Sequence, residues 1–156
     1  MVENIENSND YGEGYHGFWT HNINKINKHF GDADTLKKLS AEVHRRGMYL
    51  MVDVVINNIA LSGPGDKAVY SDFEPPFNDK KFFHPFKYVE NYGDQLEAQD
   101  GWLGDKKVSL PDLNTELPEI QKIWQDWTRE LISNYSRTFK FVHACILSLL
   151  NDKLIS

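Results

Sequence analysis

The feature that most constrains the fold is an apolar stretch that follows directly on a helical pattern. Residues 32–46 carry leucine and valine at helical spacing, and Gly47 suits the position just past a helix end. Residues 48–56 are apolar but for one aspartate, which is typical of a strand buried in a parallel sheet. A helix followed at once by such a strand predicts an α/β unit. Asn57 and Asn58 then fall at the carboxyl end of the strand, where α/β folds place their chemistry.

The rest of the chain predicts an irregular insert and a second helix. Residues 57–117 are rich in proline and aromatic residues and lack sustained periodicity. A structureless connection of this length does not fit a compact domain, so we expect a small subdomain with its own aromatic cluster. A helix is expected from Pro118, a favourable first-turn residue, to about Asn134. Residues 137–156 differ in character, and their apolar run from Phe139 to Leu150 is expected to bury itself as a helix; a replacement strand, or out-of-frame sequence without a role, are the alternatives.

Length and charge exclude several classes of protein. A chain of 156 residues can bury a core but is too short for a complete (β/α)8 barrel, which needs about 250 residues. The net charge of −6 and the lack of a basic run argue against nucleic-acid binding. No apolar run approaches the roughly 20 residues of a transmembrane helix, so no membrane partner is expected. A single cysteine, Cys145, excludes an internal disulfide framework.

Three runs carry more specific information: Tyr15-His16-Gly17-Phe18-Trp19, Asp53-Val54-Val55-Ile56-Asn57-Asn58 and Ser109-Leu110-Pro111-Asp112-Leu113. In this order and spacing they resemble three segments of the alpha-amylase family of glycoside hydrolases. These segments are the loop after the second barrel strand, the third strand, and the segment that closes the excursion domain. The secreted enzymes of fungi resemble the chain most, over about residues 2–136.

The resemblance implies an α/β fold that is part of a (β/α)8 TIM barrel. It would supply the loop after strand 2, helix 2, strand 3 and helix 3. Residues 1–56 would be a partial catalytic barrel segment, 57–117 the inserted excursion domain B, and 118–136 barrel helix 3. Residues 137–156 form a tail unlike the family, so the chain is expected to be a fragment of such an enzyme.

The resemblance also implies sugar-binding residues. Phe18 and Trp19 match aromatic residues of the family's sugar-binding cleft, and Asn58 stands where the family has a histidine that contacts sugar. Phe18 lacks the hydroxyl of the usual tyrosine, and Asn58 lacks the imidazole. The alternative is that both aromatic residues belong to the core beneath a loop. The partner implied is a starch-like α-glucan.

A calcium site is implied by the same comparison. Asn57 and Asp112 match side chains that ligate the structural calcium of the family, and Gln99 matches a backbone carbonyl ligand. Oxygen donors suit calcium, but these three supply fewer than the usual roughly six to eight ligands unless water completes the shell. Calcium is therefore doubtful in this chain. Alternatively, Asn57 caps the strand end and Asp112 makes a turn.

The family hydrolyses α-1,4-glucosidic bonds in starch and related glucans with retention, and two carboxylates carry that chemistry. Where the family has Gly-x-Arg-x-Asp with the nucleophile, this chain has Arg137-Thr138-Phe139-Lys140-Phe141, without a carboxylate. No catalytic residue is therefore assigned, and the favoured interpretation is a truncated or frame-disrupted product that is inactive alone. Two alternatives stay open: a non-catalytic glucan-binding or interaction protein, and a wrongly ended piece of an intact enzyme. The polar, acidic amino terminus predicts no signal peptide, although the family is secreted.

Overall fold

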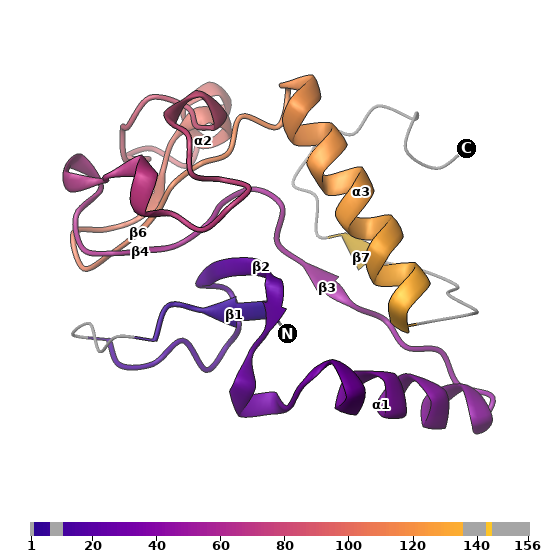
Figure 1. Ribbon diagram of the computed structural model, residues 1–156. Coiled ribbons are helices and arrows are strands. Elements are labelled where there is room, and N and C mark those ends of the chain that lie inside the picture. The colour runs from indigo at the N-terminus through magenta and orange to yellow at the C-terminus, as the bar shows by residue number, and fades with distance from the viewer. Residues whose placement is uncertain (1, 7–10, 136–142, 145–156) are drawn as a thin grey trace.

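The computed structural model describes residues 2–6, 11–135 and 143–144 (Figure 1). Its helices and strands follow in chain order: β1 (Val2–Asn4), β2 (Thr20–Ile26), α1 (Ala33–Arg45), β3 (Asp53–Val54), β4 (Leu61–Ser62), α2 (Gln95–Asp100), β5 (Leu103–Gly104), β6 (Val108–Leu110), α3 (Pro118–Tyr135) and β7 (His143–Ala144). Short 3-10 helices cover Lys28–Phe30, Gly65–Lys67, Tyr70–Asp72 and Lys80–Phe82.

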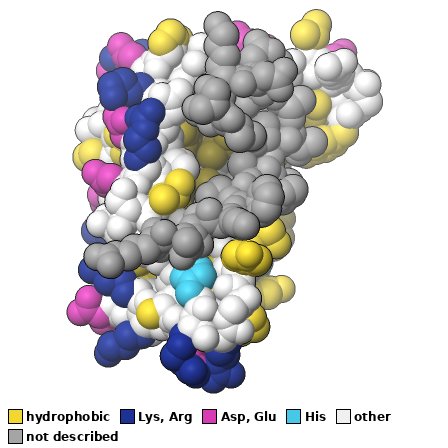
Figure 2. Space-filling view, turned by 90° about the vertical axis from the view of Figure 1, so that its right-hand side faces the viewer, with side chains coloured by type: hydrophobic (Ala, Val, Ile, Leu, Met, Phe, Trp, Pro, Cys, Tyr) yellow, Lys and Arg dark blue, Asp and Glu magenta, His cyan; other side chains and the backbone are white. Residues whose placement is uncertain are grey.

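The helices predicted over residues 32–46 and from Pro118 are both present. The Asp32 carboxylate caps α1 by accepting a hydrogen bond from the Thr35 amide at 2.7 Å, and Gly47 follows the helix with φ of 71°. Helix α3 begins at Pro118, as predicted, and buries Ile120 and Trp124. Its outer side carries charges, and on the face shown in Figure 2 basic and acidic side chains lie beside one another along one edge. No helix in the described part of the chain is long and apolar enough to cross a membrane.

The strands form small, separate sheets. Strands β1 and β2 pair antiparallel, and β4, β6 and β5 form a three-stranded antiparallel sheet within the insert (residues 57–117). Strand β3 pairs in parallel with β7, with Asp53 opposite His143 and Val54 opposite Ala144. The parallel arrangement expected for this strand is therefore present.

The strand predicted over residues 48–56 is too long and not buried throughout. Only Asp53–Val54 forms a strand, and the side chains of Tyr49 and Met51 are 62% and 66% exposed. Asp53, which the sequence reading places in the interior, is exposed as well. An apolar run needs neighbours on both sides to become a buried strand, and the described residues supply β7 on one side.

The helix expected for the apolar run of residues 139–150 is wrong at residues 143–144, where the alternative of a strand applies. These residues form a strand and not part of a helix, because their backbone pairs with β3 and satisfies its edge groups. The other residues of the predicted tail, 137–142 and 145–156, lie outside the described residues.

The aromatic cluster predicted for the insert is present but does not stand alone. Phe73, Phe82, Phe83 and Trp102 pack together inside the insert, and the same cluster continues into Ile23, Val54, Ile120 and Trp124. Phe77 makes the bridge, with its ring centroid 5.6 Å from that of Trp124 on α3. The insert and α3 therefore share one hydrophobic core.

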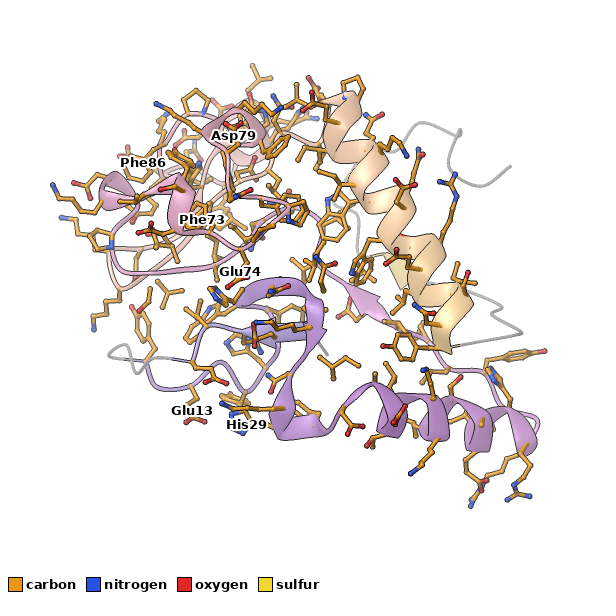
Figure 3. The ribbon with its side chains drawn as sticks, in the orientation of Figure 1. Glu13, His29, Phe73, Glu74, Asp79 and Phe86 are labelled. Carbon is orange, nitrogen blue, oxygen red and sulfur yellow. The ribbon has the colours of Figure 1, made fainter. Side chains whose placement is uncertain are left out.

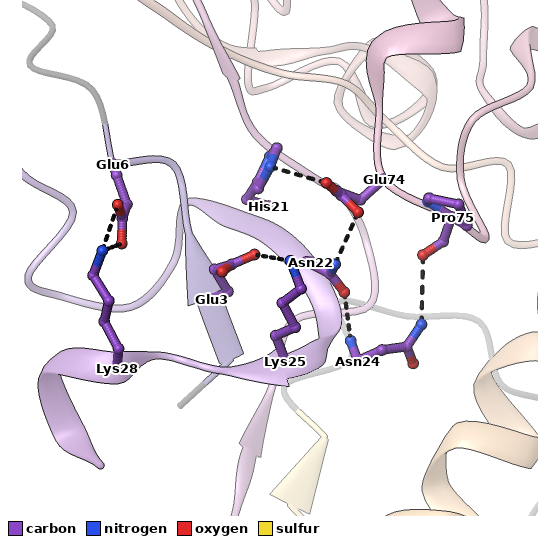
Figure 4. Close-up of polar contacts among 9 residues, drawn as sticks. All are labelled: Glu3, Glu6, His21, Asn22, Asn24, Lys25, Lys28, Glu74 and Pro75. Atoms are coloured by element: carbon purple, nitrogen blue, oxygen red, sulfur yellow. Dashed lines mark hydrogen bonds and ion pairs between the residues drawn. The ribbon is translucent and has the colours of Figure 1, made fainter. Parts of the chain in front are cut away.

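A polar junction also ties the insert to β2. Glu74, which lies between the two in Figure 3, accepts a hydrogen bond from the Asn22 amide at 3.0 Å and lies 3.8 Å from the His21 ring nitrogen. Figure 4 shows the neighbouring contact from the Asn24 amide to the Pro75 carbonyl. Because the Asn22 side chain is 5% exposed, Glu74 satisfies a buried donor as well as joining two segments.

Candidate functional site

The loop of residues 11–19, called the aromatic loop below, holds two of the predicted sugar-binding residues. Gly17, with φ of 86°, turns the chain so that the Phe18 amide donates to Nδ1 of His16 at 3.1 Å. The Phe18 ring stacks on His16 at an interplanar angle of 16°, and the Trp19 ring packs edge-on to His16. Phe18 is 50% exposed, which leaves part of an aromatic ring open to solvent.

Trp19 has a different environment. It packs against a small buried cluster made by Ile5, Ala60 and Val108. Its carbonyl accepts a hydrogen bond from the Ile5 amide at 3.0 Å. Trp19 therefore anchors the aromatic loop, whereas the Phe18 ring is half exposed.

A cavity of about 530 Å³ lies beside the aromatic loop, between β2, β3, α1 and α3. Phe18 and His16 line it from the aromatic loop, and Trp124 and Trp127 line it from α3. Thr20 also lines it, and the Thr20 hydroxyl and the Trp124 indole N–H are buried without a hydrogen-bond partner in the described part of the chain. The lining is mostly apolar, which suits rings and hydrocarbon more than free sugar hydroxyls.

Asn58 is not brought to this cavity. Its side chain is 5% exposed, and its amide donates to the Ile59 carbonyl at 3.2 Å. Its backbone bridges that of Asp112. Asn58 therefore does not line the cavity that Phe18 lines.

Two of the predicted calcium ligands do lie together. The Asn57 amide donates to Oδ1 of Asp112 at 2.8 Å, although the two residues stand at opposite ends of the insert. His84 contacts the other carboxylate oxygen, with Nδ1 2.7 Å from Oδ2. The second imidazole nitrogen of His84 lies 3.9 Å from the carboxylate of Asp100, at the end of α2.

Gln99 is the third predicted ligand and lies in the last turn of α2 (Gln95–Asp100). Carbonyl groups in a last helical turn have no intrahelical partner and are available to an outside donor or cation. Gln99 is next to Asp100, and Asp100 approaches His84. The end of α2 therefore reaches the Asn57–Asp112 pair through His84.

Burial dominates the electrostatics of this cluster. Asp112 is 1% exposed, and burial raises the pKa of its carboxyl to about 6, against the lowering effect of the hydrogen bonds from His84 and Asn57. A buried carboxylate with a raised pKa gains from a cation placed against it.

The donor set fits calcium in part. Asp112 supplies two carboxylate oxygens, and a rotated Asn57 amide would add a third beside them. No cluster of three or more His, Cys, Asp or Glu side chains with metal-binding geometry occurs among residues 2–6 and 11–135. A bound ion would thus depend on the Gln99 carbonyl and on water for the rest of its shell.

Two side-chain contacts could not be predicted from the sequence. No role is assigned to His84 from the sequence, because nothing local shows that its ring contacts Asp112. Tyr11 and Asp105 were not assigned a role, yet the Tyr11 hydroxyl donates to the Asp105 carboxylate. Both contacts join residues far apart in the chain, so periodicity and local motifs give no signal for them.

Comparison with known proteins gives a consistent result. The family profile described as Alpha amylase, catalytic domain, matches residues 5–140. The chain is similar to the alpha-amylase of Saccharomycopsis fibuligera, with 46% identity over 87% of this chain and 27% of that protein. It is also similar to alpha-amylase 2 of Schwanniomyces occidentalis, with 47% identity over 87% of this chain and 27% of that protein.

Solved structures agree with the sequence comparison. An alpha-amylase from Malbranchea cinnamomea superposes with a TM-score of 0.79 and 38% identity, over 86% of this chain and 28% of that one. An alpha-amylase from Geobacillus thermoleovorans in complex with acarbose gives 0.67 and 29%, over 86% of this chain and 26% of that one. The chain therefore spans about a quarter of the length of the relatives that it matches.

Proposed function

The chain belongs to the alpha-amylase family, and we propose that it is an α-glucan-binding segment of this family which does not hydrolyse glucan as a 156-residue polypeptide. The observation that carries the binding proposal is the half-exposed ring of Phe18, which stacks on His16 and lines the 530 Å³ cavity. An aromatic face held in this way can stack on the apolar face of a pyranose ring.

The carboxylates of the described residues support the proposed lack of glucan hydrolysis. Retaining glycosidases use two carboxyl groups about 5–5.5 Å apart across the scissile bond. In the described part of the chain Asp112 is the only buried carboxylate, and Asn57 and His84 already contact its two oxygens. The segment 137–141 has no carboxylate where the family carries its nucleophile.

Calcium is proposed as a structural ion for the same segment. Asn57, Asp112 and the Gln99 carbonyl would hold it, and the ion would neutralise the buried Asp112 charge. Because Asn57 begins the insert and Asp112 lies near its end, the ion would fasten the two ends together. Phe18 and Trp19 would remain the sugar-binding loop, and Asn58 would act through the backbone of this junction.

Glucan binding is tested by titrating purified protein with a soluble linear α-glucan in a calorimeter. Phe18→Ala should weaken binding by about threefold to tenfold, the range expected for an aromatic stacking contact. Phe30→Ala is the matched control, because Phe30 is 54% exposed but lies outside the aromatic loop. Equal affinities for the wild type and Phe18→Ala would contradict the assignment.

Turnover is tested separately by release of reducing sugar from soluble starch, with the Saccharomycopsis fibuligera enzyme as positive control. The expected result is glucan binding without sugar release. Sugar release that persists through purification and is lost in Asp112→Asn would contradict the proposed lack of catalysis. Failure to bind any glucan would favour the alternative, an interaction protein without a sugar ligand.

A further inference from the structure

We propose that Asp105 is a positioning residue for glucan binding, which holds the aromatic loop against the insert by accepting a hydrogen bond from Tyr11. The Tyr11 hydroxyl lies 2.5 Å from Oδ2 of Asp105, across a sequence separation of 94 residues. The inference rests on the proposed glucan binding by Phe18 in the same loop. It concerns a contact outside the cavity and outside the candidate calcium ligands.

Asp105 is held in place by contacts that do not involve Tyr11. Its Oδ1 accepts the backbone amides of Lys107 at 2.8 Å and Val108 at 3.2 Å, which closes the turn between β5 and β6. Its own backbone carbonyl accepts hydrogen bonds from the Tyr88 and Ser109 hydroxyls at 2.8 and 2.9 Å. Ser109 is fully buried, so this anchoring is part of the interior of the insert.

This arrangement leaves one carboxylate oxygen directed at the aromatic loop. The Tyr11 hydrogen bond is the largest of the contacts that hold the pKa of Asp105 below its ordinary value, followed by the Lys107 amide. Lys107 adds a second attachment, with Nζ 4.8 Å from the centroid of the Tyr11 ring. Asp105 thus stays ionised near neutral pH and can act as a charged acceptor.

The middle of the aromatic loop, at Gly14, has an anchor of its own. The Asn4 amide, 4% exposed, donates to the Gly14 carbonyl at 3.0 Å. A Cβ atom built on Gly14 would lie 3.0 Å from the Trp19 ring, so the ring packs closely on the loop backbone. His16 and Phe18 therefore stand between fixed points, and the Tyr11–Asp105 contact is the attachment made by exposed polar groups.

The physical consequence is a smaller loss of conformational freedom on binding. A loop already held in its binding conformation loses less entropy when a ligand stacks on Phe18. Release of Tyr11 would let residues 11–13 move away from the β5–β6 turn. Because these residues lead directly into Gly14, their release would loosen the start of the segment that carries His16 and Phe18, while Trp19 stays packed on its buried cluster. Affinity for glucan should fall without general loss of the fold.

The test compares Tyr11→Phe, Asp105→Asn and the double variant with the wild type. Asp105→Asn keeps an oxygen for the turn amides but removes the charge, and Tyr11→Phe keeps the ring near Lys107 but removes the hydroxyl. Tyr15→Phe is the matched control, since Tyr15 is in the same loop and 83% exposed. The readouts are hydrogen exchange of the peptide covering residues 11–19, the thermal midpoint, and the affinity for a soluble linear α-glucan.

The expected result is exchange of the 11–19 peptide faster by about threefold to tenfold in both single variants, with no further change in the double variant. Glucan affinity should fall by a similar factor, while Tyr15→Phe behaves as wild type and the thermal midpoints hardly change. Unchanged exchange, or a lowered thermal midpoint with faster exchange throughout the protein, would overturn the positioning role. If the loop exchanges faster in the variants but even the wild type binds no glucan, the proposed function is overturned and the loop attachment is still supported.

Discussion

At the scale of single residues, Asp112 is held in an environment that disfavours its charge. It is 1% exposed, and its pKa of about 6 lies above the ordinary aspartate value of 3.8. Between pH 3.8 and about 6, the Asp112 carboxyl is mostly deprotonated in the unfolded chain but still mostly protonated in the folded chain. Stability due to this group therefore falls as pH rises from about 4 to 6 and stays low above 6, by up to about 3 kcal/mol for a shift of this size.

Asp112→Asn should remove this pH dependence, because an amide cannot titrate. Without calcium, the variant should be more stable than the wild type at pH 7, by up to about 3 kcal/mol, and should differ little near pH 4. Urea unfolding at several pH values with a chelator present measures the difference. Added calcium should stabilise the wild type and not the variant, and Asp100→Asn, at the surface end of the same cluster, serves as the control.

The residues of this cluster differ in how far sequence could identify them. Asn57 and Asp112 could be paired because their motifs resemble those of one family, although nothing in their spacing requires a contact. His84 could not, since its partner lies 28 positions away across irregular chain. The apolar neighbours of Asp53 in the sequence predict a buried position. Its side chain is exposed, because the strand around it has few pairing partners.

At the scale of elements, the helices were predictable because their signals are local. The Asp32 cap, the Pro118 start and apolar residues at helical spacing lie within each element. The strands were not, because a strand exists only where another segment pairs with it. Pairing partners such as β3 and β7, or β4 and β6, are set by the packed chain and not by the run itself.

The contact between the insert and α3 can be tested at Phe77. Phe77 is 2% exposed and packs on Trp124, so Phe77→Ala should leave a cavity and lower the free energy of unfolding by about 3–5 kcal/mol. Phe30→Ala, at a half-exposed position, should change it by less than about 0.5 kcal/mol. Denaturant titration followed by tryptophan fluorescence measures both, and equal small effects would contradict a shared core.

At the scale of the whole molecule, apolar surface gathers around one end of α1 and the chain leading to β3. Leu39, Met48, Tyr49 and Met51 are each about half exposed or more, and Leu39 and Met51 line the 530 Å³ cavity. Exposed apolar side chains that gather on a surface promote association and bind hydrophobic dyes.

We expect the purified protein to bind an anilinonaphthalene sulfonate dye under native conditions and to associate as its concentration rises. Met51→Lys should reduce both effects, because it places a charge at a position that is 66% exposed. Val69→Lys, at a 53% exposed position in the insert, is the control and should leave dye binding unchanged. Dye fluorescence and light scattering measure the outcome, and a dye-free monomer at all concentrations would show that this surface is covered in solution.

The parallel pairing of β3 with β7 also affects the order in which the molecule can form. Asp53 meets His143 only after the insert and α3, which lie between them in sequence, have been placed. A contact of such long sequence separation closes late and slowly, since the intervening loop must first lose its freedom. During synthesis on the ribosome, the strand stays without its partner until residue 143 has emerged, long after α1 can form. Its apolar neighbours are therefore exposed to chaperones, or to other nascent chains, while the residues between β3 and β7 are synthesised.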